Sequence, residues 1–575
     1  MSKINFIALG GVQEDGKNLY VIEVNNMIFV MDCGMKYPNQ DSYGVDIIVN
    51  DLTYLSENKG RIQGLFLSHA HMDHIGGVIH LLKEKPDLRI YGSKYTMAVL
   101  GDILKDDKNV DYSKASLEVV TSKTALKFQD VTIRFFEVSH NLPESYGIAL
   151  KSDDGYIIYT SNYNFDQNSH MDYAHMFRSL AVFAKEGVLA LLTESLGANN
   201  EQSRGTILEF KTRIKNVFNQ SNDRLIFSLF SSDILRIQQI CDIAIGYGRK
   251  IAIIGRKTQK MVAQAIDLGY LNIPEENFAN LKFIDEKNGI TNEDKNLVIL
   301  VTGNRHEPFF MLQRMAKGVD RLIHLTKKDT VIVLTPPTLG TEKMASKTLD
   351  IIYHITSRVL EFNSTLLPQI NANREEIKEM INILEPKYII PVIGEYRHQY
   401  ALRIVAECIG YKDSEILIPD QGDILSFSDG KYIGVTGDVP VAEVLIDGKA
   451  FKDVGEVVMR DRELLAQDGV ILITANINPR TKTILLGPEV VTKGFTYTKD
   501  SESLISKIKE LFYLVSEKYL CSRFINWSEY KTGLKNEISH YIYKETKRSP
   551  IIIPVLISTD LDMVNRTIEE EKNEN

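Results

Sequence analysis

Cysteine is scarce in this sequence of 575 residues, which holds only four. Cys33, Cys241, Cys408 and Cys521 lie far apart, and no two of them form a short-spaced pair. This spacing argues against both a disulfide framework and a zinc site made of cysteine pairs. The cysteines therefore favour a reducing, cytoplasmic location.

Long apolar runs and an excess of positive charge are missing as well. No stretch approaches the ~20 apolar residues that a membrane span needs, and the first residues show no signal-peptide or lipidation pattern. The formal net charge is -9. A chain this acidic does not attract nucleic acid through its overall field, so an RNA substrate would require local basic residues or bound metal.

The length predicts about three domains. Residues 1 to 200 read as strand-rich, with a hairpin over 18–33 that turns at Asn25-Asn26. From about 205 to 365, short apolar strands alternate with helical patterns, which predicts βαβ units and a mostly parallel sheet. After about 445 come two strands and then two helices with apolar stripes, which we interpret as core or as a subunit interface.

The densest group of candidate ligands lies between Ser68 and Gly77. It holds three imidazoles and one carboxylate within six positions, directly after the apolar run 65–67; these are His69, His71, Asp73 and His74. Histidine is the commonest metal ligand, and a carboxylate suits a second, harder metal position. The pattern His-x-His-x-Asp-His at a strand end therefore predicts a metal site.

With this motif the sequence resembles the ribonuclease J family, the β-CASP branch of the metallo-β-lactamase superfamily. Further matching segments run along nearly the whole chain: 10–11, 16–20, 31–34, 139–145, 165–167, Gly303 with Glu307-Pro308, and 394–397. The resemblance implies an α/β protein, a metallo-β-lactamase αββα sandwich with an inserted β-CASP α/β domain and a small α+β C-terminal domain. The implied parts are the sandwich in two pieces (1–205 and 365–445), the β-CASP domain (206–364), a linker and C-terminal domain (446–562), and a charged, disordered tail (563–575).

The resemblance also implies a first metal position held by His69, His71 and His140. All three residues are present, and three histidines with an open fourth position are typical of catalytic zinc, which lowers the pKa of bound water. Zn²⁺ or Mn²⁺ is the expected ion. Asp32 is expected behind the histidines, where a carboxylate fixes the orientation of an imidazole; the alternative is a turn Asp.

The second metal position would use Asp73 and His74, but two further ligands of active relatives are replaced. Their bridging Asp corresponds to Asn162, and the histidine of their His-Gly-Glu-Tyr-Arg motif corresponds to Ile393. Ile393 has no ligand atom, and the amide of Asn162 is neutral. Asp73 alone compensates less of the charge of two close ions, so we expect the second metal to be weak or absent.

Substrate contacts depart from the family as well. Asn371 stands where active relatives carry a histidine in a glycine-rich run, and loss of a general acid typically costs ~10²–10⁴-fold in rate. Leu235 replaces a usual His and Lys257 a usual Ser. Arg236, Arg256, Lys257 and Asn371 are the candidate RNA contacts; the alternative for the basic residues is surface charge on loops.

Two functions follow from the resemblance. The first is a metal-dependent ribonuclease of low activity, a 5′-to-3′ exonuclease with endonuclease activity left open, that acts on 5′-monophosphorylated single strands in rRNA maturation and mRNA decay. The second is a degenerate structural or regulatory subunit, because the losses resemble those of the family's second, less active paralogue in Gram-positive bacteria. The implied partners are RNA, a second copy in a homodimer or higher oligomer, and a more active paralogue in a heteromer. A small-molecule hydrolase is disfavoured, because the two additional domains suit nucleic acid.

Overall fold

The computed structural model describes residues 2–38, 44–107, 112–165, 173–200, 205–255, 258–279, 294–338, 340–448, 456–495 and 501–559. The chain forms two compact units. The first comprises 1–39 with 46–444, the second comprises 40–45 with 445–575, and the boundary falls within β22 (Glu443–Ile446). In the described part of the chain, no helix is both long and apolar enough to cross a membrane.

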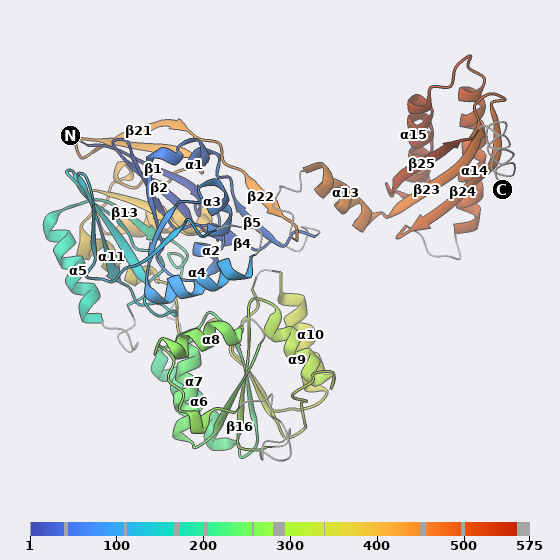
Figure 1. Cartoon of the computed structure of the whole chain (residues 1–575). Coiled ribbons are helices and arrows are strands. Elements are labelled where there is room, and N and C mark those ends of the chain that lie inside the picture. Colours follow the sequence, from blue (N-terminus) through green and yellow to red (C-terminus); the bar gives the residue numbers. More distant parts are fainter. Residues whose placement is uncertain are drawn as a thin grey trace, which may run out of the picture. The chain divides into compact units, whose positions relative to one another are not determined.

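Two sheets build most of unit 1 (Figure 1). The eight-stranded sheet has the order β21-β20-β1-β2-β3-β6-β7-β8. Its strands are β1 (Lys3–Gly10), β2 (Leu19–Val24), β3 (Met27–Met31), β6 (Ile62–Phe66), β7 (Arg89–Gly92), β8 (Ser116–Val119), β20 (Asp423–Ser428) and β21 (Lys431–Asp438). The expected hairpin over 18–33 is confirmed as the antiparallel pair β2 and β3.

The six-stranded sheet has the order β19-β13-β12-β11-β10-β9. Its strands are β9 (Ala125–Phe128), β10 (Val131–Glu137), β11 (Tyr146–Ser152), β12 (Gly155–Tyr159), β13 (Val188–Glu194) and β19 (Tyr388–Val392). Strand β19 is distant in sequence, yet it pairs in parallel with β13. The last strand of this sheet therefore comes from the part of the chain that follows the intervening domain.

The two sheets pack face to face. Alternate residues of a strand point to opposite faces, and in β1 Phe6 lies in the core between the sheets while Ile7 lies in the core beneath the helices. Across the sandwich, the ring of Phe66 lies 6.4 Å from that of Phe135. Helices α3 (Val78–Glu84) and α4 (Lys94–Asp106) share a core with the eight-stranded sheet. Helices α5 (Tyr173–Glu186), α11 (Arg374–Leu384) and α12 (Tyr396–Cys408) share one with the six-stranded sheet. The expected αββα layering is confirmed.

A separate five-stranded sheet of order β15-β16-β14-β17-β18 lies between residues 225 and 361. Its strands are β14 (Leu225–Phe230), β15 (Lys250–Ile254), β16 (Leu297–Gly303), β17 (Thr330–Val333) and β18 (Val359–Glu361), all paired in parallel. Helices α6 (Ile207–Gln220), α7 (Ile234–Gly246) and α8 (Thr258–Asp267) cover one face, and α9 (Glu307–Ala316) and α10 (Glu342–Tyr353) cover the other (Figure 1). The predicted parallel sheet is confirmed, and β18 is an additional edge strand.

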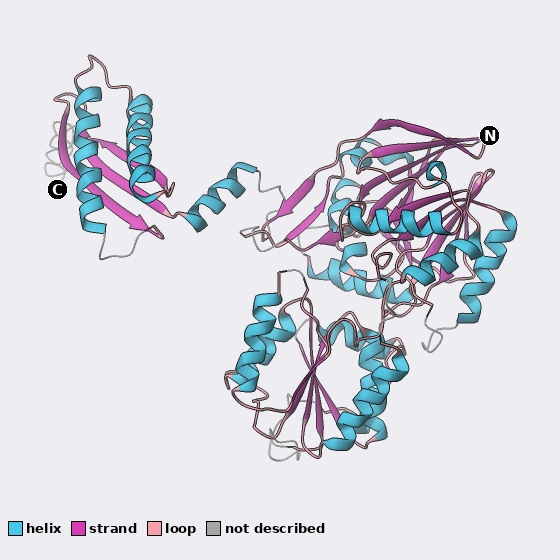
Figure 2. Cartoon of the chain, turned by 180° about the vertical axis from the view of Figure 1, so that it is seen from behind, coloured by secondary structure: helices cyan, strands magenta, loops and turns pink. Residues whose placement is uncertain are grey.

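Unit 1 also contains several short elements. They are α1 (Thr53–Glu57), α2 (Met72–Ile75), and the antiparallel pair β4 (Met35–Lys36) and β5 (Ile47–Asn50). Unit 2 contains α13 (Glu456–Gln467), β23 (Val470–Asn478), β24 (Thr483–Lys493), α14 (Ser501–Leu520), α15 (Trp527–Thr546) and β25 (Ile551–Ser558). Its sheet has the order β24-β23-β25, and its core joins the sheet to α14 and α15 (Figure 2).

Candidate metal centre

The candidate ligands lie where strands of the two sheets end close together. His69 and His71 follow β6, and His140 follows β10 of the other sheet. A hydrogen bond from the backbone N–H of Tyr146 to the carbonyl of Ser68 joins the two sheets at this point. The fold therefore brings together residues that are about 70 positions apart in the sequence.

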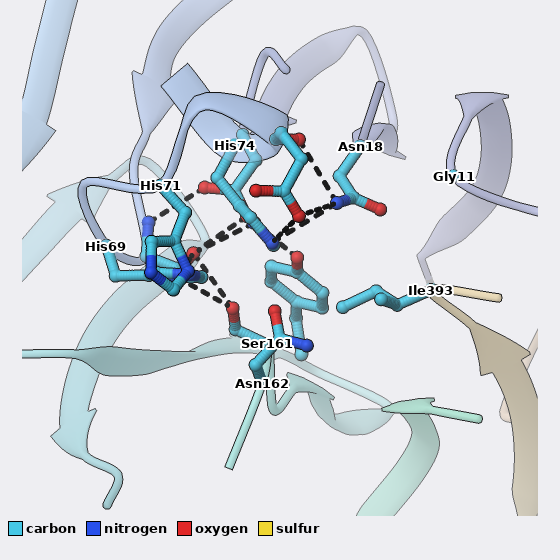
Figure 3. A network of polar contacts seen from close by, with 12 residues as sticks. Gly11, Asn18, His69, His71, His74, Ser161, Asn162 and Ile393 are labelled. Atoms are coloured by element: carbon cyan, nitrogen blue, oxygen red, sulfur yellow. Dashed lines mark hydrogen bonds and ion pairs between the residues drawn. The ribbon is translucent and has the colours of Figure 1, made fainter. Parts of the chain in front are cut away.

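The three histidines converge on one point. Nε2 of His69 lies 3.0 Å from Nδ1 of His71, both residues being labelled in Figure 3, and Nε2 of His140 lies 3.3 Å from the same atom. All three ring nitrogens lie within 4.8 Å of one another. The outward Nδ1 of His140 donates to the carbonyl of Ile370 at 2.8 Å, which leaves a lone pair on its inward Nε2. The residues fit one metal ion with three nitrogen ligands.

Electrostatics keeps these rings in the form that binds metal. Burial, and then the neighbouring His71, lowers the pKa of His140 to about 3. Burial lowers the pKa of His69 well below its ordinary value and also lowers that of His71. A buried imidazole among other imidazoles resists protonation. The three rings therefore stay neutral, and a neutral imidazole is the ligand form.

Asp32 is fully buried and accepts four hydrogen bonds. Its Oδ1 accepts from the backbone N–H of Ser68 at 2.8 Å. Its Oδ2 accepts from the hydroxyl of Ser68 at 2.8 Å, the hydroxyl of Tyr159 at 2.7 Å and Nδ1 of His74 at 2.7 Å. Ser68 in turn contacts Nδ1 of His69 at 3.0 Å. Asp32 thus touches His74 directly and reaches His69 through Ser68.

Asp73 and His74 contact each other on the side of the centre near Asn18. Nε2 of His74 lies 3.3 Å from Oδ2 of Asp73 and 3.2 Å from the amide nitrogen of Asn18. Burial opposes protonation of His74, but Asp73 and Asp32 outweigh it and raise its pKa to about 10. Burial likewise opposes ionisation of Asp73, yet His74 holds the pKa of that carboxyl below its usual range. In this structure the two candidate ligands of the second position therefore satisfy each other.

Asn162 and Ile393 occupy the remaining places around the second position (Figure 3). The amide nitrogen of Asn162 donates to Glu194 at 2.8 Å, while its oxygen is buried without a hydrogen-bond partner. Ile393 is fully buried and has a φ of 51°, a conformation that β-branched residues rarely adopt. One neutral oxygen and one apolar side chain thus stand where a second metal would need two ligands.

Two functional neighbours were not identified from the sequence. Asn18 was noted only as part of a matching segment, yet its amide contacts both Asp73 and His74. Glu194 gave no signal, although burial raises its pKa to about 8 while it accepts from Asn162 and from the backbone of Tyr163 and Ala372. Both depend on contacts between segments that are distant in sequence.

The candidate RNA contacts differ in their burial, and two of them lie outside the part of the chain that the structure describes. Arg236 is buried against Asp233, with Nε 2.7 Å from the carboxylate, and its guanidinium lies over Phe210. It lines a small cavity of about 20 Å³ next to His140. Asn371 is half-buried in the loop beside that cavity. Arg256 and Lys257 lie outside the described residues. RNA contact by any of them stays a prediction.

A two-sheet sandwich with three convergent histidines and an inserted parallel α/β domain defines a metallo-hydrolase of the metallo-β-lactamase superfamily. The family model "Metallo-beta-lactamase superfamily" matches residues 12–150. "Ribonuclease J, beta-CASP domain" matches 222–352, "Zn-dependent metallo-hydrolase RNA specificity domain" matches 371–417, and "Ribonuclease J C-terminal domain" matches 457–559.

Relatives match over almost the full length. Ribonuclease J2 of Bacillus subtilis is 34% identical, with 96% of this chain and 98% of the relative covered. Ribonuclease J 2 of Streptococcus pyogenes is 35% identical, with 97% and 100% covered. A crystal structure of a protein of unknown function from Enterococcus faecalis is 12% identical, with 74% of this chain and 100% of that chain covered at a TM-score of 0.53, and it supports the fold alone. The chain belongs to the ribonuclease J family.

Proposed function

We propose that the protein is a metal-dependent ribonuclease of low intrinsic activity. The observation that carries this proposal is the convergence of His69, His71 and His140 on one point. These residues would hold a Zn²⁺ or Mn²⁺ ion, which would activate water and polarise a phosphodiester when bound. Asp32 orients His74 directly and His69 through Ser68.

Low activity follows from what the rest of the site lacks. Asn162 offers a neutral oxygen and Ile393 offers no ligand, so the second position has only Asp73 and His74 of its expected set. Asn371 cannot donate a proton as an acid, and the loss of general acid catalysis typically costs ~10²–10⁴-fold. We propose slow 5′-to-3′ exonucleolytic removal of nucleotides from 5′-monophosphorylated RNA, with endonucleolytic cleavage as a minor activity. The biological processes would be rRNA maturation and mRNA decay.

The same losses favour a second function. A chain that keeps its fold but lacks second-position ligands suits a structural or regulatory subunit that pairs with a more active paralogue. The names of the relatives above designate a second member of the family. The two functions are compatible, since a regulatory subunit can retain slow cleavage.

Several sequence expectations remain part of this proposal. We propose the domain limits 1–205 with 365–445, 206–364 and 446–562, and a charged tail over 563–575 that lies outside the described residues. The helices and strands between 207 and 361 support the second range. A cytoplasmic location is proposed from the four cysteines, all of which are unpaired.

The test compares cleavage of a 5′-monophosphorylated RNA with metal content. The purified chain, with added Mn²⁺ or Zn²⁺, should cleave slowly, and His71→Ala should abolish both cleavage and bound metal measured by emission analysis. His354→Ala, a change at an exposed histidine outside the site, is the matched control and should leave both unchanged. Cleavage that survives His71→Ala would contradict the proposal. Activity that appears only after mixing with an active paralogue would favour the subunit function.

A further inference from the structure

The start of helix α7 in the inserted domain lies against the loop that carries His140. The backbone N–H of Leu235 donates to the carbonyl of Asn141 at 3.2 Å, and Asn141 directly follows His140 in the chain. The first N–H groups of a helix have no partner within the helix. One of these donors is therefore satisfied by the residue next to a candidate metal ligand, so a backbone contact joins the two domains at the metal centre.

Arg236 extends this contact to a second loop beside the metal centre. The side chain is 6% exposed; its Nε donates to Asp233 at 2.7 Å, and its Nη2 lies 3.5 Å from the carbonyl of Pro368. Two residues after Pro368, the carbonyl of Ile370 accepts from Nδ1 of His140 at 2.8 Å. Arg236 thus contacts the loop that fixes the orientation of the His140 ring.

The same segment also faces His71. Burial lowers the pKa of His71, and Asp73 is the strongest influence that raises it. The carbonyl of Ser232 and the carboxylate of Asp233 also raise this pKa, so both groups lie close enough to act on the ring. Two of the three candidate ligands thus have neighbours from one short segment of the inserted domain, residues 232–236.

The burial of Arg236 is not explained by the stability of α7. The carboxylate of Asp233 caps the helix by accepting from the backbone N–H of Arg236 at 3.2 Å, which does not require the guanidinium. Among the described residues, Nη1 of Arg236 has no hydrogen-bond partner, and a buried unsatisfied donor costs about 1–3 kcal/mol. Replacing a buried ion pair with apolar residues is often neutral or stabilising. The contact of Arg236 with the loop that holds His140 therefore explains its position better.

We propose that residues 232–236 of the inserted domain position the histidines of the first metal site, with Arg236 and Asp233 as the positioning residues. Outer partners fix the orientation of metal-binding imidazoles. Metal binding and the docking of the inserted domain then support each other, because coupling between two equilibria is reciprocal. This inference rests on the metal position of the proposed function and is independent of RNA cleavage.

Zinc affinity tests the positioning role. Arg236→Ala should weaken zinc binding about 10- to 100-fold in competition with a chromogenic chelator. The Co²⁺-substituted protein should also show shifted visible absorption bands, because these bands report on ligand geometry. Arg224→Ala is the matched control: it breaks another buried Arg–Asp pair of the same domain, with Asp329, and should leave both readouts unchanged.

The zinc measurement separates two failures. If the wild-type chain bound no zinc, the proposed function would fail and this inference with it. Zinc binding that is as tight in Arg236→Ala as in the wild type would overturn this inference alone.

Hydrogen exchange in the wild-type chain tests the coupling without a substitution. Saturating zinc should slow exchange of the amide of Leu235 roughly 5-fold or more, because the metal holds the loop of Asn141 in place. The amide of Thr330, which donates to the carbonyl of Arg224 in the same domain, should exchange at the same rate with and without zinc. Zinc that slows both amides equally, or neither of them, would overturn the proposal.

Discussion

Asp32→Asn tests most directly whether Asp32 supports the histidines of the metal centre. The change preserves shape and tolerates the left-handed backbone of residue 32, whose φ is 57°. It places an NH₂ group either against the N–H of Ser68 or where the hydroxyls of Ser68 and Tyr159 and the ring of His74 now donate. At least one donor therefore faces another donor in a site without water access.

The expected loss of local stability follows from these contacts. A hydrogen bond to a charged group contributes about 1.5–3 kcal/mol, and removing one partner of a buried charged pair costs about 3–5 kcal/mol. We expect a local loss of about 3–5 kcal/mol, which should speed amide hydrogen exchange around Ser68 on the order of 10²–10⁴-fold. Because Asp32 supports His69 through Ser68, zinc affinity should fall about 10–100-fold.

Hydrogen exchange is the suitable readout, because a chain with several domains does not unfold in two states. Zinc affinity is measured by competition with a chromogenic chelator. Asp329→Asn is the matched control: Asp329 is 2% exposed and accepts from Arg224 at 2.7 Å, within the parallel α/β domain. It should loosen that domain and leave zinc affinity unchanged. If Asp32→Asn bound zinc as tightly as the wild type, the proposed support of the histidines would be refuted.

Three further changes have defined outcomes. Asn162→Asp combined with Ile393→His should raise bound metal from one ion to two per chain by emission analysis, and no gain would count against the roles assigned to these positions. Arg224→Ala should destabilise its domain by about 3–5 kcal/mol, because Asp329 stays buried without its partner. The temperature of the calorimetric transition of that domain should therefore fall, and an unchanged temperature would disprove this. Burial lowers the pKa of His80 to about 4, so between pH 6.5 and that value the unfolded chain binds a proton that the folded chain does not, and stability falls as pH falls. His80→Gln should reduce this loss in urea titrations at neutral pH and about pH 5, and an identical loss in both proteins would show that His80 does not contribute.

Much of the fold could be predicted because its signals are local. Four short apolar strands separated by helical patterns were sufficient to predict the parallel sheet, and the Asn25-Asn26 turn to predict the first hairpin. The small edge strand β18 was missed, because three residues, of which two are exposed, carry no periodic signal. The layering of helices on the sandwich came from the family resemblance, since no local pattern encodes the pairing of β13 with β19.

Some residues of the site also have a local signal in the sequence, and others do not. The spacing of His69 and His71 at a strand end predicts that they are ligands, whereas His140 could be assigned only through the resemblance. The contacts of Asn18 and Glu194 with the centre could not be predicted, because each depends on which side chain a distant segment presents at a distance of about 3 Å. For Arg236 the sequence predicted an RNA contact or a surface charge on a loop, but the side chain is buried against Asp233.

The structure also explains why second-position ligands can change while the fold persists. Ile393 is held by its backbone: its N–H donates to the carbonyl of Gly11 at 2.7 Å, and its carbonyl accepts from the N–H of Ser195 at 3.2 Å and the hydroxyl of that residue at 3.1 Å. None of these contacts depends on the side chain, so the strained φ is imposed by the surrounding fold. An isoleucine in this place offers no ligand atom, and its side chain is buried between the sheets. Replacing ligands is therefore inexpensive for folding, and the same rigidity should let restored ligands point at the second position.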